Sequence, residues 1–241
     1  MNGYIALLGS GEYLPVMDEV DQFLLAHCGA EGRKPKVVCL PTAAGDEGPK
    51  SVGQWSQMGV NHFTRLGADV QAVPVINVKS ANDPNHASAV EEADLIYFSG
   101  GDPNYLYRTL KDTLVWEAAH KAWARGAVYA GCSAGAMILS TEMPDFRALG
   151  IRSMAAFGLL PVSSIMPHFD ALPIFGKPLI ATLRRRLEDD EMMLGIDADT
   201  AAVGRLNGEW TVMGKSRVHV FTKADIKTYT AGEKFSLGNK R

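Results

Sequence analysis

The pentapeptide at 131–135, Gly-Cys-Ser-Ala-Gly, constrains the fold more than any other segment, because it places a serine at the apex of a G-x-S-x-G pattern. The apolar run 127–130 before it predicts a buried strand, and the run 136–139 after it predicts a helix. Glycines on both sides leave room for a sharp strand-to-helix turn that side chains would block. We therefore expect a nucleophile elbow that exposes the Ser133 hydroxyl. The alternative is a plain glycine turn in which Ser133 caps the helix.

Strands alternate with helices up to residue 140, which is typical of a parallel sheet covered by helices on both faces. The predicted strands are 4–8, 36–40, 69–75, 95–98 and 127–130, and the predicted helices are 15–26, 52–66, 105–110 and 114–125. After residue 150, an Asn207-Gly208 turn joins 200–204 to 210–213 as a hairpin, and 217–221 alternates as a further strand. We expect an α/β fold, a three-layer α/β/α sandwich in a single domain over residues 1–241. Antiparallel C-terminal strands should finish one edge of its mainly parallel sheet.

Glycine-rich segments follow several predicted strands, and in such sheets ligands bind beyond the carboxyl ends of the strands. The segments 9–11 and 100–101 should therefore converge on the Ser133 turn. The Ala134 N–H, at the start of the helix, is an unpaired donor suited to an oxyanion, and the amides of Gly100 and Gly101 could supply a second one. A plain strand-ending turn is the alternative for the two glycines. The 9–11 segment lacks the third glycine of a dinucleotide fingerprint.

Composition excludes several classes of function. The chain has 241 residues, 46% of them hydrophobic, and a net charge of -3, with no basic patch beyond the arginine run 184–186. Nucleic acid is therefore not an expected partner, and a small peptide or metabolite fits better. The chain enters a strand at once, without the basic segment and long apolar stretch of a secretion signal, and no window reaches the roughly 18 apolar residues of a membrane span. We expect a cytoplasmic protein with no membrane partner. A homodimer is left open.

The cysteines point to neither a metal nor a disulfide framework. There are three, Cys28, Cys39 and Cys132, and no two have C-x-x-C spacing. No cofactor or metal is expected. Cys132 precedes the apex serine by one residue, where a side chain points into the sheet, so we interpret it as a small buried residue rather than a thiol nucleophile.

A serine nucleophile needs a general base, usually a histidine. Of the six histidines, His168 is the best candidate, because it lies just past the end of a short predicted strand, between Pro167 and Phe169. His219 lies inside an alternating strand and is interpreted as a half-buried structural residue. The others are interpreted as surface residues: His27, His62, His86 and His120.

Over about residues 5–205 the chain resembles the serine peptidases related to peptidase E and cyanophycinase, which have the class I glutamine amidotransferase-like fold. That family carries a G-x-S-A-G-A elbow, an earlier F-x-G-G-[DN] segment, a later H-F pair and a G-I-D-E-[DNG]-T-A stretch. The matching segments here are 131–136, 98–102, 168–169 and 195–201. The resemblance implies that Ser133 attacks a peptide carbonyl, that His168 acts as the base, and that short peptides are the substrates, as in peptidase E-like relatives that prefer an amino-terminal Asp.

Two departures from the family pattern matter. Cyanophycinase-like relatives have D-Q before the histidine and arginines after it. This chain has Met166 and Pro167 and then Leu172, Ile174 and Lys177, which disfavours cyanophycin as substrate. The carboxylate that the family supplies to the histidine falls on Ala198 in an ungapped match. Asp199 is therefore the first candidate for the acid and Asp197 the second, with Glu12 as a more distant option. The cations that an amino-terminal Asp would need could be Arg147, Arg152 or 184–186.

Two other functions compete with a peptidase. A family member that keeps the pocket but has lost turnover would bind small ligands, and the substitution at Ala198 would permit this. An α/β-hydrolase has its nucleophile, acid and histidine in the chain order that Ser133, Asp199 and His219 would satisfy. Against the second, His219 lies within a predicted strand rather than on a loop after one.

Overall fold

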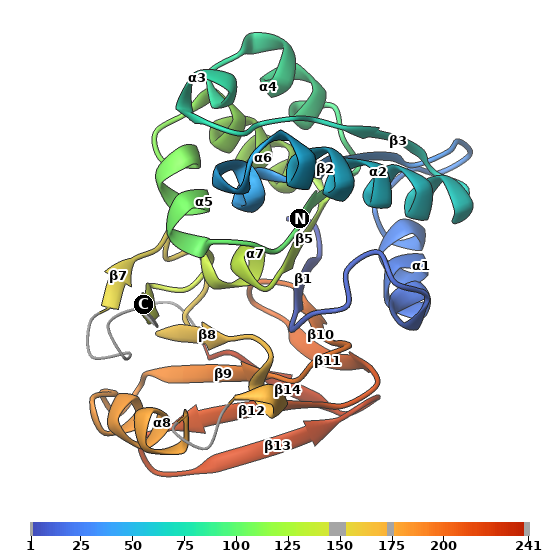
Figure 1. Cartoon of the computed structure of the whole chain (residues 1–241). Helices are drawn as coiled ribbons and strands as arrows, with labels where there is room; N and C mark the ends of the chain where they lie inside the picture. The colour runs from blue at the N-terminus through green and yellow to red at the C-terminus, as the bar shows by residue number, and fades with distance from the viewer. Residues whose placement is uncertain (1, 145–152, 173–175, 239–241) are drawn as a thin grey trace.

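A mixed sheet forms the centre of the molecule (Figure 1). The computed structural model describes residues 2–144, 153–172 and 176–238, and within them this central sheet has eight strands, in the order β14-β11-β10-β1-β5-β4-β2-β3. The parallel strands are β1 (Ile5–Leu8), β2 (Lys36–Leu40), β3 (Asp69–Ala72), β4 (Leu95–Phe98) and β5 (Val128–Cys132). The antiparallel strands are β10 (Thr200–Gly204), β11 (Glu209–Gly214) and β14 (Lys234–Ser236). The predicted α/β fold, with a mainly parallel sheet and antiparallel strands at one edge, is confirmed.

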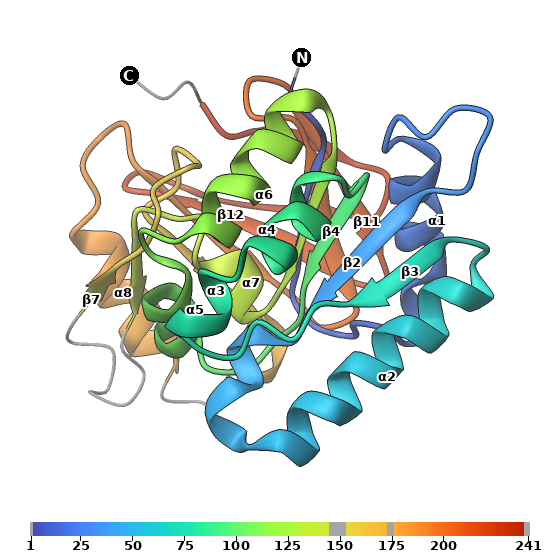
Figure 2. The ribbon, with the colours of Figure 1, turned by 90° about the horizontal axis from the view of Figure 1, so that it is seen from above.

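Helices cover both faces of the central sheet, as Figure 2 shows. Residues such as Leu8 and Phe63 form the core beneath α1 and α2, and residues such as Leu7 and Trp116 form the core on the opposite face, beneath α4 and α6. The helices are α1 (Asp18–Ala26), α2 (Pro49–Arg65), α3 (Val78–Ala81), α4 (Pro84–Glu91), α5 (Pro103–Leu110), α6 (Leu114–Arg125), α7 (Ala134–Met137) and α8 (Gly176–Arg185). Short 3₁₀ helices are η1 (Pro15–Met17), η2 (Thr42–Glu47) and η4 (Phe169–Ala171).

A second sheet lies below the central sheet in the view of Figure 1. Its strands, in order, are β13 (Ile226–Thr230), β12 (Arg217–Thr222), β9 (Met192–Ile196) and β8 (Ser164–Met166). A further pair is β6 (Glu142–Pro144) and β7 (Ser153–Ala155). The expectation that 217–221 would extend the edge of the central sheet is wrong, because β12 pairs with β9 and β13 instead. The chain turns away after β11 at Gly214, where φ is 93° and a Cβ would lie 2.5 Å from the Asp199 carbonyl oxygen.

The two sheets share one continuous apolar core. Buried residues of the second sheet, such as Ile165 and Leu194, belong to the same cluster as Ile5 and Leu139 around the central sheet. This places β8, which leads into His168, against α7, which follows Ser133. No helix within the described ranges is long and apolar enough to cross a lipid bilayer.

His62 departs from the sequence-based expectation of a surface residue. It is buried on α2, at 3% exposure, and its Nε2 lies 2.7 Å from Oδ2 of the buried Asp21 on α1. Arg65 donates to the other ring nitrogen at 3.1 Å, so Nδ1 is an acceptor and the Nε2 proton is donated to Asp21. Burial, above all, raises the pKa of Asp21.

Three residues that the sequence analysis singled out lie outside the described residues: Arg147, Arg152 and Ile174.

Candidate active site

Ser133 lies on a sharp turn between β5 and α7, formed by residues 131–135 and called the Ser133 turn below. Its backbone has φ 49° and ψ −105°, a conformation that few non-glycine residues adopt and that costs on the order of 1–3 kcal/mol. A Cβ on Gly135 would lie 2.7 Å from the Phe98 carbonyl oxygen, and one on Gly131 would collide with the Gly135 carbonyl. Gly135 is thus needed for close packing against β4 and Gly131 for the tight turn into α7, and Ser133 is half-buried.

Backbone hydrogen bonds fix the Ser133 turn. The Ser133 N–H donates to the Leu8 carbonyl of β1 at 2.9 Å, and the Ser133 carbonyl accepts from Ala136 and Met137 at 3.0 Å. The Tyr129 hydroxyl donates to the Gly135 carbonyl at 2.7 Å. These hydrogen bonds hold the Ser133 turn in place, and such surrounding contacts are what allow one residue to keep a strained backbone conformation.

Three backbone amides were predicted as oxyanion donors, and the structure separates them into two groups. The N–H groups of Gly101 and Ala134 have no acceptor among the described residues. The Gly100 N–H, in contrast, donates to Oε1 of Glu12 at 2.9 Å. Gly101 has φ 143°, and a Cβ there would collide with the Ala43 carbonyl, so only glycine fits. Two amides, in the residues that directly follow Gly100 and Ser133, therefore have no acceptor among the described residues, and the third is occupied.

Glu12 also reaches the residue before the nucleophile candidate. Its Oε2 accepts from the Cys132 thiol at 3.0 Å, and the residue is only 9% exposed. Burial, followed by the nearby Glu12 carboxylate, raises the pKa of the Cys132 thiol well above its usual value. Cys132 is therefore a neutral, buried hydrogen-bond donor. The interpretation of Cys132 as a buried residue is confirmed.

His168 lies between β8 and η4 as the N-cap residue of η4, with an exposed side chain and a left-handed backbone, φ 49° and ψ 39°. The next two residues anchor this segment to β9 and the turn after it. The Phe169 ring packs so closely on Gly195 that a Cβ there would lie 2.6 Å from it, and Oδ1 of Asp170 accepts from the Ala198 N–H at 2.8 Å. No hydrogen bond joins the His168 ring to Ser133 within the described chain.

The two candidate acids bind other partners. Asp197 is buried, accepts from the Ser216 hydroxyl at 2.7 Å, and pairs with Nε2 of His219 at 3.2 Å. Asp199 Oδ2 lies 3.9 Å from Nζ of Lys215. In the described part of the chain, neither carboxylate is hydrogen-bonded to His168, so the contact that we predicted for Asp199 is not formed. Asp197 binds His219 rather than His168 because of the strand register. Gly195 on β9 pairs with His219 on β12, which brings the His219 imidazole to Asp197.

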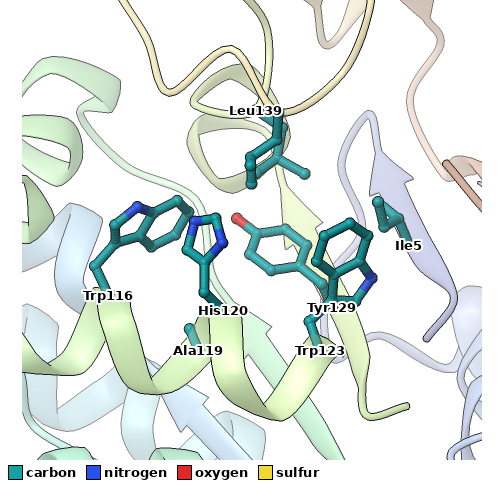
Figure 3. Close-up of a pocket in the computed structure, with 8 residues that line it drawn as sticks. Ile5, Trp116, Ala119, His120, Trp123, Tyr129 and Leu139 are labelled. Carbon is teal, nitrogen blue, oxygen red and sulfur yellow. The ribbon is translucent and has the colours of Figure 1, made fainter. Parts of the chain in front are cut away.

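A small cavity lies between α6 and the central sheet. Trp116, His120, Trp123 and Tyr129 surround it (Figure 3), and its volume is about 10 Å³. That is room for about one water molecule, and the lining is almost wholly apolar. Burial lowers the pKa of His120 at its rim. This cavity is too small for a substrate, and among the described residues no cluster of three metal-binding side chains was found.

Comparison with known proteins identifies a peptidase family. The model of peptidase family S51 matches residues 5–205. The uncharacterized peptidase YgaJ of Bacillus subtilis is 30% identical over 172 residues, 70% of this chain and 70% of its own length. A cyanophycinase of Synechococcus elongatus is 28% identical over 87% of this chain and 65% of its own length. A peptidase E of Citrobacter koseri is 26% identical over 67% of this chain and 69% of its own length.

A solved structure supports the same conclusion. The crystal structure of a peptidase from an acI-B1 Actinobacterium superposes with a TM-score of 0.87 at 38% sequence identity. The match covers 98% of this chain and 97% of that one, so it includes both sheets.

Proposed function

This chain belongs to peptidase family S51 and is a serine-type peptidase, and we propose that Ser133 is its nucleophile and His168 its general base. The observation that carries the proposal is the strained Ser133 turn, with φ 49° and ψ −105°; in support, the N–H groups of Gly101 and Ala134 have no acceptor among the described residues. A nucleophile elbow needs such a turn, because it lifts the hydroxyl out of the sheet and leaves donors beside it.

In the proposed reaction, Ser133 Oγ attacks the scissile carbonyl carbon while its proton passes to the His168 ring. The carbonyl oxygen becomes an oxyanion and accepts hydrogen bonds from the Gly101 and Ala134 amides. The tetrahedral species collapses, His168 returns the proton to the leaving amine, and an acyl-enzyme forms. Water then attacks the ester, again with His168 as base, and releases the acid and the free serine.

The mechanism requires a hydrogen bond between Ser133 and His168. The Ser133 hydroxyl and the His168 ring must come within about 2.6–3.2 Å when substrate is bound, although the hydrogen bond is not formed in the free protein. The His168 side chain is exposed, and it follows β8, which lies against α7, the helix that begins after Ser133. The acid that orients His168 is left unassigned, with Asp199 and Asp197 as the sequence-based candidates.

We propose short peptides as substrates, with dipeptides that begin with Asp as the first class to test. Support comes from the resemblance to peptidase E. Arg184 gives no further support, because it donates to the backbone oxygens of Thr222 and Lys223 at 2.8 and 3.2 Å and so serves the second sheet.

The test is hydrolysis of a dipeptide library by the wild type and by Ser133→Ala. We expect the substitution to lower turnover by roughly 10³-fold or more, and His168→Ala to do nearly the same, because the two side chains act as a unit. Undiminished turnover by Ser133→Ala would refute the assignment. An inactive wild type that still binds dipeptides would favour the second candidate, a binding protein without turnover. That candidate draws support from the missing contact between His168 and any aspartate described.

A further inference from the structure

One buried carboxylate next to the Ser133 turn has no part in the proposed mechanism. Glu12 lies on the loop after β1 and is 9% exposed, and both of its oxygens are used. Oε1 accepts from the Gly100 N–H at 2.9 Å, and Oε2 accepts from the Cys132 thiol at 3.0 Å. A carboxylate removed from water needs such donors, because an unpartnered buried charge is strongly unfavourable. The buried Glu12 carboxylate therefore has a hydrogen-bond donor for each of its oxygens at this position.

The partners of Glu12 are the residues that immediately precede the proposed site groups. Gly100 precedes Gly101, and Cys132 precedes Ser133. A Cβ on Gly100 would lie 2.8 Å from Oε1 of Glu12 and 3.4 Å from the Ser133 Cβ, so the carboxylate and the serine flank the same glycine. One side chain thus joins the loop after β4 to the end of β5.

The loop that carries Glu12 is itself tightly fixed. Residues on both sides of Glu12 have left-handed backbones, with φ 86° at Gly11 and φ 64° at Tyr13. Tyr13 is buried, with its ring 4.9 Å from that of Tyr97 and 6.2 Å from that of Phe63. A left-handed aromatic residue is rare, and it persists here because its ring is locked into the core. The backbone therefore holds the Glu12 side chain toward Gly100.

We propose that Glu12 is a positioning residue that holds the Gly100–Gly101 segment so that the Gly101 amide faces the oxyanion. The proposal rests on the roles assigned above to Ser133 and Gly101. Two consecutive glycines have wide conformational freedom, and the charge-assisted hydrogen bond from the Gly100 N–H removes it before substrate binds. The Gly101 amide then needs no reorganisation as charge develops, which is the condition for effective electrostatic stabilisation.

A competing role for a carboxylate near a peptidase nucleophile is to bind the α-ammonium group of a substrate. Burial argues against it, because at 9% exposure Glu12 offers little surface to a ligand. Its two oxygens also already have a donor each. The two roles differ in what they do to kinetics: positioning acts on kcat, whereas ammonium binding acts on KM and only for peptides with a free amino terminus.

The experiment compares Glu12→Ala, Glu12→Asp and Glu12→Gln with the wild type. Kinetic constants are measured on one cleaved peptide and on its amino-terminally acetylated form, together with the rate of Ser133 modification by a fluorophosphonate, which needs no substrate. Removing an oxyanion donor lowers kcat by about 10²–10³-fold, and here a donor is misplaced rather than removed, so we expect losses of about 10–100-fold for Glu12→Ala. The fluorophosphonate rate should fall with kcat, and KM should stay within about twofold, as for an interaction made only in the transition state.

The other two variants separate reach from charge. Glu12→Gln keeps an acceptor oxygen at the Gly100 N–H and should recover most of the lost kcat. Glu12→Asp keeps the charge but is one methylene shorter, and it should resemble Glu12→Ala. Glu12→Asp therefore also provides the test if the alanine variant does not fold. Asp21→Asn is the matched control, because it removes a buried carboxylate that is hydrogen-bonded to His62 rather than to Gly100. It should alter thermal stability and leave kcat and the fluorophosphonate rate unchanged.

Unchanged kcat in folded Glu12→Ala or Glu12→Asp would overturn the proposal. So would a rise in KM for the free peptide alone, which would assign Glu12 to substrate binding. If Ser133→Ala is inactive while the Glu12 variants behave as wild type, only the role of Glu12 fails. If Ser133→Ala keeps full activity, the proposed function itself has failed.

Discussion

Gly195→Ala tests how the fold positions His168. The added methyl carbon would lie 2.6 Å from the Phe169 ring, whereas carbon atoms are comfortable at about 3.5–4.0 Å, so the ring must move by about 1 Å. Overpacking of this kind destabilises by about 1–3 kcal/mol, and replacing a strand glycine by alanine returns about 0.5–1 kcal/mol. The net loss is about 0–2.5 kcal/mol, so for a chain of this size we expect Tm to fall by up to roughly 10 °C.

The effect on turnover should be larger than the effect on stability. Phe169 follows His168 directly, and Asp170 is tied to the Ala198 N–H, so a displaced ring moves the backbone that carries the proposed base. A misplacement of about 1 Å at a catalytic group can lower the rate by about 10²-fold. We therefore expect kcat to fall by about 10–100-fold at temperatures well below Tm.

The assay is peptide hydrolysis combined with thermal unfolding. Gly53→Ala is the matched control, because a Cβ at Gly53 on α2 meets nothing within 4 Å, and it should leave kcat unchanged and raise Tm slightly. Adding Phe169→Leu to Gly195→Ala should relieve the overlap and restore part of both losses. If Gly195→Ala lowers Tm but keeps the kcat of the wild type, the claim that Phe169 positions His168 is refuted.

Three further predictions follow from the described contacts. Cys132→Ser should keep kcat within about twofold, because a hydroxyl can donate to Glu12 as the thiol does, and a large loss would reopen the case for a thiol nucleophile. Asp199→Asn should lower kcat by less than about tenfold, since Asp199 is not bound to His168; a loss near 10⁴-fold would instead show that it acts as the acid. Burial would raise the pKa of Asp94, but hydrogen bonds from Arg33 and the Lys36 N–H outweigh it and lower that pKa. The stability that this lowering provides is present above the unfolded-state pKa and lost as pH falls through the folded-state pKa. Arg33→Gln should therefore destabilise the protein near neutral pH and progressively less as pH falls below the unfolded-state pKa of about 3.9, and a pH-independent difference in chemical denaturation would contradict this.

Local patterns in the sequence were sufficient for the elements near the site. The alternation of apolar runs with helical segments predicted the parallel sheet, and G-x-S-x-G predicted the turn at Ser133, because each depends on residues close together in the chain. The pairing of 217–221 was missed for the opposite reason. Its alternating pattern suits a strand of either sheet, and the turn at Gly214 directs the chain to the second one, where β12 lies between β13 and β9.

Contacts between distant segments were the least predictable part of the site. His62 looks like a surface residue beside Asn61, and its burial depends on Asp21, far earlier in the chain. A signal was present, because Gly59, His62 and Phe63 lie on one helical face. Glu12 and Gly100 are likewise brought together only by the sheet, which sets β1, β5 and β4 side by side.

Mapping the site of covalent modification tests the central claim most directly. The protein is treated with a fluorophosphonate, digested, and examined by mass spectrometry, and no knowledge of the substrate is needed. The account predicts one adduct, on Ser133, that is absent in Ser133→Ala and forms far more slowly in His168→Ala. An unmodified Ser133, or an adduct on another serine that persists in Ser133→Ala, would contradict it.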